Sequence, residues 1–267
     1  MPTSAEQFSA ALDRLRTEGR MLENLVQDLP AEDWAKPTPA AGWTIAHQIA
    51  HLTWTDGAAL AALHGEAAFE PYKQRSQENR LEFVDEVATQ GAQQDPVDLY
   101  TQWQTSRAQL ATALEQSDKT VRYPWFGPGM KARSMITARI METWAHGQDV
   151  ANALGAQWPA TDALQDIAHL GLATRQFTYQ NNDLEAPTSE LYVELTGPND
   201  QLWMWGNPTA ENSVTGSAWD FALLVTQRAE LEDLNLQITG DDAKTWASIA
   251  QAFAGPPKAA VRARQAR

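Results

Sequence analysis

Two pairs of residues with metal-binding side chains occur at helical spacing in this sequence. Glu142 and His146 are four residues apart, so on a helix their carboxylate and imidazole would lie side by side on one face. His47 and His51 show the same spacing earlier in the chain. Two imidazoles and one carboxylate form a common open catalytic zinc set, in which water or substrate completes the coordination. We therefore predict that Glu142 and His146, together with a histidine of the His47/His51 pair, bind one divalent metal ion.

The neighbours of this set leave two arrangements open. Arg139 and Asp149 continue the polar stripe of Glu142 and His146, while Ile140 and Trp144 lie on the other side of the same helix. The stripe either faces solvent, with ordinary i,i+4 pairs, or points into a polar cavity. Asp149 could orient a ligating imidazole. His47 could be a fourth ligand, a base or a neighbour. We count Asp149 and His47 as candidate catalytic residues.

The chemistry available to such a site is narrowed by the absence of cysteine. No protein thiol can act as a ligand or a nucleophile, so the nucleophile must be water or a thiol that arrives from solution. Zinc is the expected ion, and iron(II) and nickel(II) are compatible with the same ligands.

The composition excludes several classes of partner. The 267 residues carry a formal charge of -14, which disfavours binding to nucleic acids and to acidic membrane surfaces. The first twenty residues lack the apolar core of a signal peptide, and no apolar run is long enough to span a membrane. We expect a cytoplasmic protein, either a monomer or a homodimer.

The elements that must position these residues are helices in the first half of the chain. Apolar periodicity and helix-ending residues predict helices over residues 4–29, 44–64, 95–116 and 134–154, with a long crossing connection, which together suggest a four-helix bundle. Residues 66–94 are predicted as a short helix plus an irregular insertion. Residues 123–129 form a Pro- and Gly-rich loop whose aromatic residues suit the rim of a pocket.

The second half of the chain predicts an α+β domain. Helices are expected over 161–179, 219–228 and 241–253, and strands over 190–195, 201–205 and 234–238. The predicted domains are therefore a metal-binding bundle, 1–157, and an α+β domain, 158–255. A basic tail, 256–267, begins with two prolines and is predicted to be disordered.

Two stretches of this sequence resemble a known family. Residues 42–52, GWTIAHQIAHL, and residues 141–150, METWAHGQDV, are similar to the second- and fourth-helix motifs of mycothiol-dependent maleylpyruvate isomerases and their DinB-like relatives. The order and spacing agree over most of residues 1–155. The likeness is closest to a DinB-like subfamily of unsettled function. It implies a DinB-like bundle followed by a sterol-carrier-like α+β domain, with His51, Glu142 and His146 as zinc ligands.

The resemblance also implies a cofactor and a reaction. Mycothiol would be the thiol cosubstrate, and the protein would be a zinc-dependent isomerase or thiol S-transferase acting on a small electrophile. Arg228, after an apolar helix, matches a functional arginine of the family, although an arginine that caps a helix end explains it equally well. Trp125 and Arg139 are our candidates for contacts with the cofactor. The alternatives are a metal-dependent hydrolase and a non-catalytic protein that binds metal or lipid.

Overall fold

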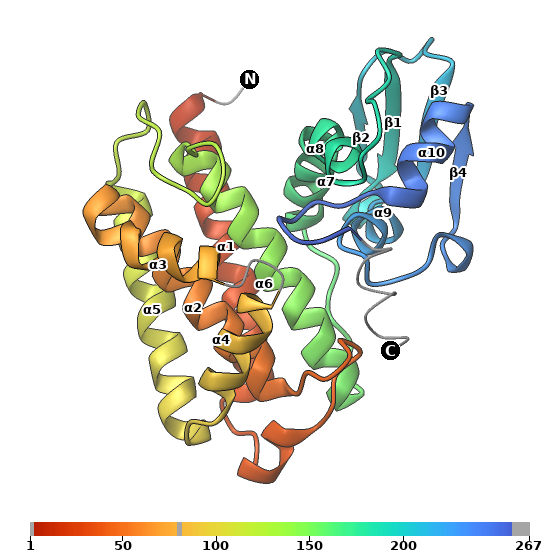
Figure 1. Cartoon of the computed structure of the whole chain (residues 1–267). Coiled ribbons are helices and arrows are strands. Elements are labelled where there is room, and N and C mark those ends of the chain that lie inside the picture. The colour runs from red at the N-terminus through yellow and green to blue at the C-terminus, as the bar shows by residue number, and fades with distance from the viewer. Residues whose placement is uncertain (1–2, 79–81, 258–267) are drawn as a thin grey trace. The chain divides into compact units, whose positions relative to one another are not determined.

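The computed structural model describes residues 3–78 and 82–257, and the chain divides into two compact units (Figure 1). The first unit is Met1–Trp158 and the second is Pro159–Arg267. Most of the predicted basic tail, from residue 258 onward, lies outside the described residues.

The first unit is built on four long helices, which confirms the predicted bundle. Contacts run from α2 to α5, from α5 to α1, from α1 to α6 and from α6 back to α2, so the four helices enclose one core. Leu12, Leu22, Ile49, Leu110 and Ile140 are among the buried apolar side chains that fill it. The bounds are α1 Ser4–Val26, α2 Ile45–Leu63, α5 Pro96–Gln116 and α6 Ala132–Leu154.

Local signals in the sequence set the ends of these helices. Thr3 caps α1 through reciprocal hydrogen bonds with Glu6, and Asp95 accepts a hydrogen bond from the backbone of Val97 at the start of α5. Gly155 adopts a left-handed conformation (φ 64°) that ends α6. Before α2, the 3₁₀-helix Ala31–Ala35 leads into a turn in which the Ile45 amide donates to the carbonyl of Lys36.

The segment between α2 and α5 differs from the prediction. Instead of one short helix and an irregular insertion, its described residues form two helices, α3 Glu66–Glu78 and α4 Phe83–Ala92. Both contact α2, and α4 does so more extensively than α3. Phe69 on α3 and Val87 and Ala88 on α4 are buried, so each of these otherwise polar helices is anchored by a few apolar side chains.

The second unit is α+β, as predicted. Its four-stranded sheet has the order β2-β1-β3-β4, in which β1 and β3 are parallel and the other pairs are antiparallel. Helices α9 and α10 pack on the sheet, and α7 contacts α9 (Figure 1). The strands are β1 Leu191–Thr196, β2 Leu202–Trp205, β3 Asn212–Ser217 and β4 Leu236–Thr239; the helices are α7 Ala163–Ala173, α8 Arg175–Asn181, α9 Ala218–Val225 and α10 Asp241–Ile249.

Two features of this unit were not anticipated. Strand β3 lies in the middle of the sheet although only Val214 in it is strongly apolar, so it lacks the alternation that reveals strands. The helix predicted over 161–179 is two helices, because Thr174 leaves helical geometry between them. Its hydroxyl lies within hydrogen-bonding distance of the carbonyls of Leu170 and Gln251, which ties the break to the C-terminal segment.

Among the described residues, no helix is long and apolar enough to cross a membrane.

Close packing of α6 against the end of the first unit generates a stability prediction. A Cβ atom added at Gly147 would lie 2.2 Å from the Trp158 ring, whose Nε1 donates a hydrogen bond to the buried Glu18 (3.1 Å). We expect Gly147→Ala to lower the free energy of unfolding by about 1–3 kcal/mol, since the ring must move. Urea denaturation measures this change.

Gly127→Ala is the matched control, because nothing lies within 4 Å of a Cβ at that position. Its stability should stay within about 0.5 kcal/mol of the wild type. Equal stability of the two variants would contradict the packing described for Gly147.

Candidate metal centre

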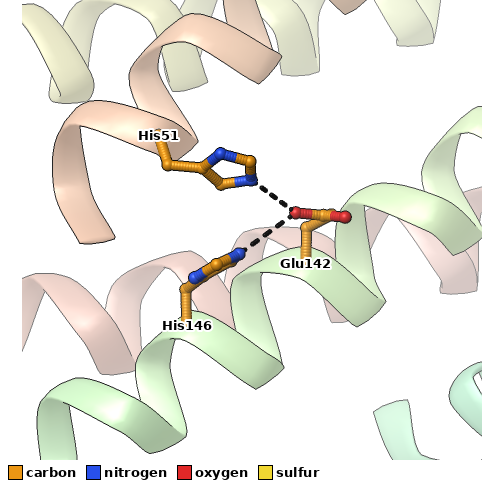
Figure 2. Close-up of side chains that lie close together, drawn as sticks. All are labelled: His51, Glu142 and His146. Carbon is orange, nitrogen blue, oxygen red and sulfur yellow. Dashed lines mark hydrogen bonds and ion pairs between the residues drawn. The ribbon is translucent and has the colours of Figure 1, made fainter. Parts of the chain in front are cut away.

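His51, Glu142 and His146 converge at the contact between α2 and α6. Figure 2 shows the His51 ring approaching from α2, while Glu142 and His146 extend from successive turns of α6. The Nε2 atoms of His51 and His146 lie 2.9 Å and 3.3 Å from the same oxygen, Oε2 of Glu142. One potential ligand atom from each residue lies within 4.8 Å of the others. The predicted i,i+4 pair and a histidine far away in sequence therefore meet at one point.

The surroundings of this group decide between the two arrangements left open by the sequence. The side chains of His51, Glu142 and His146 are 10%, 20% and 12% exposed, so the polar stripe of α6 does not face open solvent. The opposite side of α6 is also buried, at Ile140 and Trp144. The stripe points toward α2 and stays only slightly accessible.

Hydrogen bonding controls the electrostatics of the carboxylate. Burial alone would raise the pKa of Glu142, but hydrogen bonds from His146 and His51 outweigh burial and hold this pKa well below its usual range. An ionised carboxylate between two imidazoles offers a cation one ligand atom from each of three side chains. A divalent ion at this point would displace any protons held between the three side chains.

Gln48 is a partner of this group that the sequence did not reveal. It is fully buried on α2, three residues before His51, and its Oε1 accepts a hydrogen bond from Nδ1 of His146. Its Nε2 donates to Oγ1 of Thr38 (2.8 Å). The sequence contains only a weak indication that Gln48 belongs to this group: it is a polar residue one turn from His51, in a helix otherwise rich in Ala, Ile and Leu.

Trp43 covers the imidazoles and was likewise missed. Its ring centroid lies 5.5 Å from that of His51 and 5.9 Å from that of His146, with the second pair nearly parallel. Its Nε1 donates a hydrogen bond to Oδ1 of Asp85 on α4 (2.9 Å). The turn before α2 and the helix α4 thus hold an indole over the group.

Arg139 forms a buried ion pair one turn from Glu142. Its Nε donates to Oδ1 of Asp56 on α2 at 2.9 Å, and the two side chains are 3% and 8% exposed. Burial raises the pKa of Asp56, an effect that the cations of Arg139 and Arg107 oppose. Contact between Arg139 and a cofactor remains a prediction.

His47 and Asp149 lie outside the group of three. The Nδ1 atom of His47 is 2.8 Å from Oγ1 of Thr44, in the cap of α2, and burial lowers the pKa of His47 although Asp85 opposes this change. Asp149 is buried on α6, three residues after His146. Their proposed catalytic roles stay predictions.

Trp125 belongs to an aromatic cluster beside α2. Its ring lies 5.9 Å from Phe69 and 5.1 Å from Phe126, and Phe126 in turn stacks on Trp54 (5.8 Å). Trp54 follows His51 by three residues, so the cluster borders the same stretch of α2. Contact between Trp125 and a cofactor stays a prediction.

Arg228 lies in the second unit, just after α9. Its Nη1 donates to the carbonyl of Thr226 (2.7 Å), and its amide donates to the carbonyl of Leu223 (2.9 Å). Gln227, which lies between Thr226 and Arg228, has a left-handed backbone (φ 57°), so Arg228 helps to close the end of the helix. A role in binding a carboxylate stays a prediction.

Comparison with known proteins gives relatives for both units. The profile described as "Mycothiol maleylpyruvate isomerase N-terminal domain" matches residues 15–151. Uncharacterized proteins from two strains of Mycobacterium tuberculosis are each 50% identical to the chain over 243 residues, or 91% of this chain and 95% of theirs.

Solved structures with the same fold are also found. The crystal structure of a histidine-to-alanine mutant of mycothiol-dependent maleylpyruvate isomerase aligns with a TM-score of 0.60 and 17% identity, covering 89% of this chain and 95% of the other. A second crystal structure of mycothiol-dependent maleylpyruvate isomerase gives a TM-score of 0.58 at 18% identity, over 85% and 93% of the two chains. At this identity the likeness concerns the fold.

The buried pair beside the group yields a stability prediction. Arg139→Leu leaves the Asp56 carboxylate buried without its partner, so we expect the free energy of unfolding to fall by about 3–5 kcal/mol. The double variant Arg139→Leu/Asp56→Leu should recover most of this loss, because it removes both charges. Chemical denaturation of the metal-free proteins measures both.

Arg75→Leu serves as the comparison, since the side chain of Arg75 is 31% exposed in its ion pairs with Glu78 and Glu86. This substitution should lower the free energy of unfolding by no more than about 1 kcal/mol. If Arg139→Leu were equally mild, the pair would not be structural, and a role for Arg139 in ligand binding would gain weight.

Proposed function

The chain belongs to the mycothiol maleylpyruvate isomerase N-terminal domain family, and from this premise we propose that it is a zinc-dependent enzyme that uses mycothiol. The reaction would be the isomerisation of a small electrophilic substrate or the transfer of the thiol to it. A cytoplasmic location is part of this proposal. The observation that carries it is the convergence of His51, Glu142 and His146 on one point.

The ligand set supports a divalent ion. Two imidazole nitrogens and one carboxylate oxygen are each electron-pair donors, and three such atoms within 4.8 Å repel one another unless protons or a cation lie between them. Zinc suits this set with one position left for an exogenous ligand, and iron(II) or nickel(II) fit the same donors.

The absence of cysteine supports an external thiol. A bound divalent ion would lower the pKa of the mycothiol thiol and so favour its thiolate, which is the nucleophilic form. In an isomerisation, the thiolate sulfur would form a bond to one alkene carbon while the π electron pair moves onto the electron-withdrawing group that activates the alkene, and the remaining C–C single bond could rotate. Return of that electron pair would re-form the π bond and break the C–S bond, so that the thiolate leaves unchanged.

The residues of the chain have separate proposed tasks. His51, Glu142 and His146 hold the ion, and Asp149 and His47 are candidates for orienting a ligand or moving a proton. Trp43 would limit the access of water to the group, because its indole lies against two of the imidazoles.

Three further residues are proposed to recognise the molecules that react. Trp125 and Arg139 would contact the thiol cofactor, and Arg228 would bind a carboxylate of the substrate through charge-assisted hydrogen bonds. Arg228→Met should therefore raise KM more than it lowers kcat.

Metal analysis tests the ligand set. We expect the wild-type protein to retain one equivalent of zinc after dialysis, and His51→Ala, Glu142→Ala and His146→Ala each to retain far less, because each removes one of three ligands. His64→Ala is the control, since this exposed histidine lies at the C-terminal end of α2, outside the group. Unchanged zinc in Glu142→Ala would refute the assignment.

Addition of mycothiol to the cobalt(II)-loaded protein tests the use of a thiol. Calorimetric heat and a new thiolate-to-cobalt absorption band should appear together, and S-methylated mycothiol should give no band. Maleylpyruvate should isomerise only when mycothiol is present, if this electrophile is accepted. Thiol-independent hydrolysis of an ester or amide, without any such band, would instead favour the metal-dependent hydrolase.

A further inference from the structure

One hydrogen-bonded side chain distinguishes the two histidines of the metal centre. Nδ1 of His146 donates to Oε1 of Gln48, whereas Nδ1 of His51 has no hydrogen-bond partner among the described residues although it is buried. Trp43 packs against both rings, so packing alone does not account for the difference.

The hydrogen bonds around Gln48 form a chain with matched donors and acceptors. The hydroxyl of Thr38 donates to the carbonyl of Trp43 (3.0 Å) and accepts from Nε2 of Gln48 (2.8 Å). The amide oxygen of Gln48 is then directed at Nδ1 of His146. An acceptor at Nδ1 requires a proton there, so a metal ion that displaces the proton shared by Nε2 and Glu142 would leave a neutral ring whose electron pair lies on Nε2.

We propose that Gln48 is a positioning residue that fixes His146 with Nδ1 protonated and Nε2 directed to the metal. The inference rests on the proposed metal centre and adds a residue that touches neither metal nor substrate. A hydrogen-bonded partner behind a ligating imidazole commonly changes metal affinity by 10–100-fold, because it holds the ring orientation and raises its basicity. Gln48 is fully buried, which removes competition from water at this hydrogen bond.

Zinc affinity of four proteins tests the proposal: the wild type, Gln48→Leu, Gln48→Glu and Gln102→Leu. Gln48→Leu should raise the Kd for zinc by about 10–100-fold, since its side chain fills space but accepts no hydrogen bond. Gln48→Glu should stay within a few-fold of the wild type. The glutamate carboxylate can accept a hydrogen bond from His146. The Thr38 hydroxyl can turn away from the Trp43 carbonyl and donate to this carboxylate, because the carbonyl still accepts a hydrogen bond from the backbone amide of Thr38 (2.9 Å).

Gln102→Leu is the matched control, because Gln102 is exposed on α5 and should leave the Kd unchanged. Rescue by glutamate but not by leucine separates positioning from packing. Thermal unfolding of the metal-free variants detects any general loss of stability.

Nitrogen-15 NMR of the zinc-loaded wild type supplies a second readout. His146 should show a proton on Nδ1 and the shift of a metal-bound nitrogen on Nε2. Metal on Nδ1, or an unchanged zinc Kd in Gln48→Leu, would overturn the inference while leaving the metal centre intact. A wild-type protein that takes up no zinc would instead overturn the proposed function, and this inference with it.

Discussion

The first unit of this protein places one mostly buried carboxylate, that of Glu142, between two imidazoles. Glu142 lies at the contact between α2 and α6, and its Oε2 is within 3.3 Å of Nε2 of both His51 and His146. An ionised carboxylate is costly to bury unless positive charge and hydrogen bonds accompany it. The helix that carries Glu142 must therefore pair with the helix that carries His51 in one register, because a shift of either helix by one turn would leave Glu142 with His146 alone.

Other buried polar contacts follow from the same register. Arg139 and Asp56 pair along the seam between α6 and α2, and Gln48 joins α2 to His146 one turn before His51. Each contact satisfies groups that would otherwise be buried without partners. The loop before α2 contributes Trp43, and α4 contributes Asp85 to hold its indole. Helix α4 thus helps to hold Trp43 over the two imidazoles, although its segment was predicted to be partly an irregular insertion.

Sequence reasoning found the parts of this arrangement that depend on local spacing. Glu142 and His146 share a face because they are four residues apart, and the start of α5 at Asp95 and the end of α6 at Gly155 follow from local signals. The pairing of Gln48 with His146 joins residues 98 apart, and no local period predicts it. Strand β3 escaped detection for a related reason, since a strand between two others takes its stability from its neighbours.

Charge accounting explains why an amide, rather than a carboxylate, suits position 48. Glu142 brings one negative charge, so a divalent ion would leave the group with one positive charge, which favours an anionic ligand such as a thiolate. Arg139 and Asp56 balance each other and add no net charge. A carboxylate behind His146 would cancel the remaining positive charge, whereas Gln48 provides the acceptor and leaves this charge in place. If the centre binds a metal as proposed, the residues behind the ligands would therefore bear on which molecule it attracts as well as on how it holds the ion.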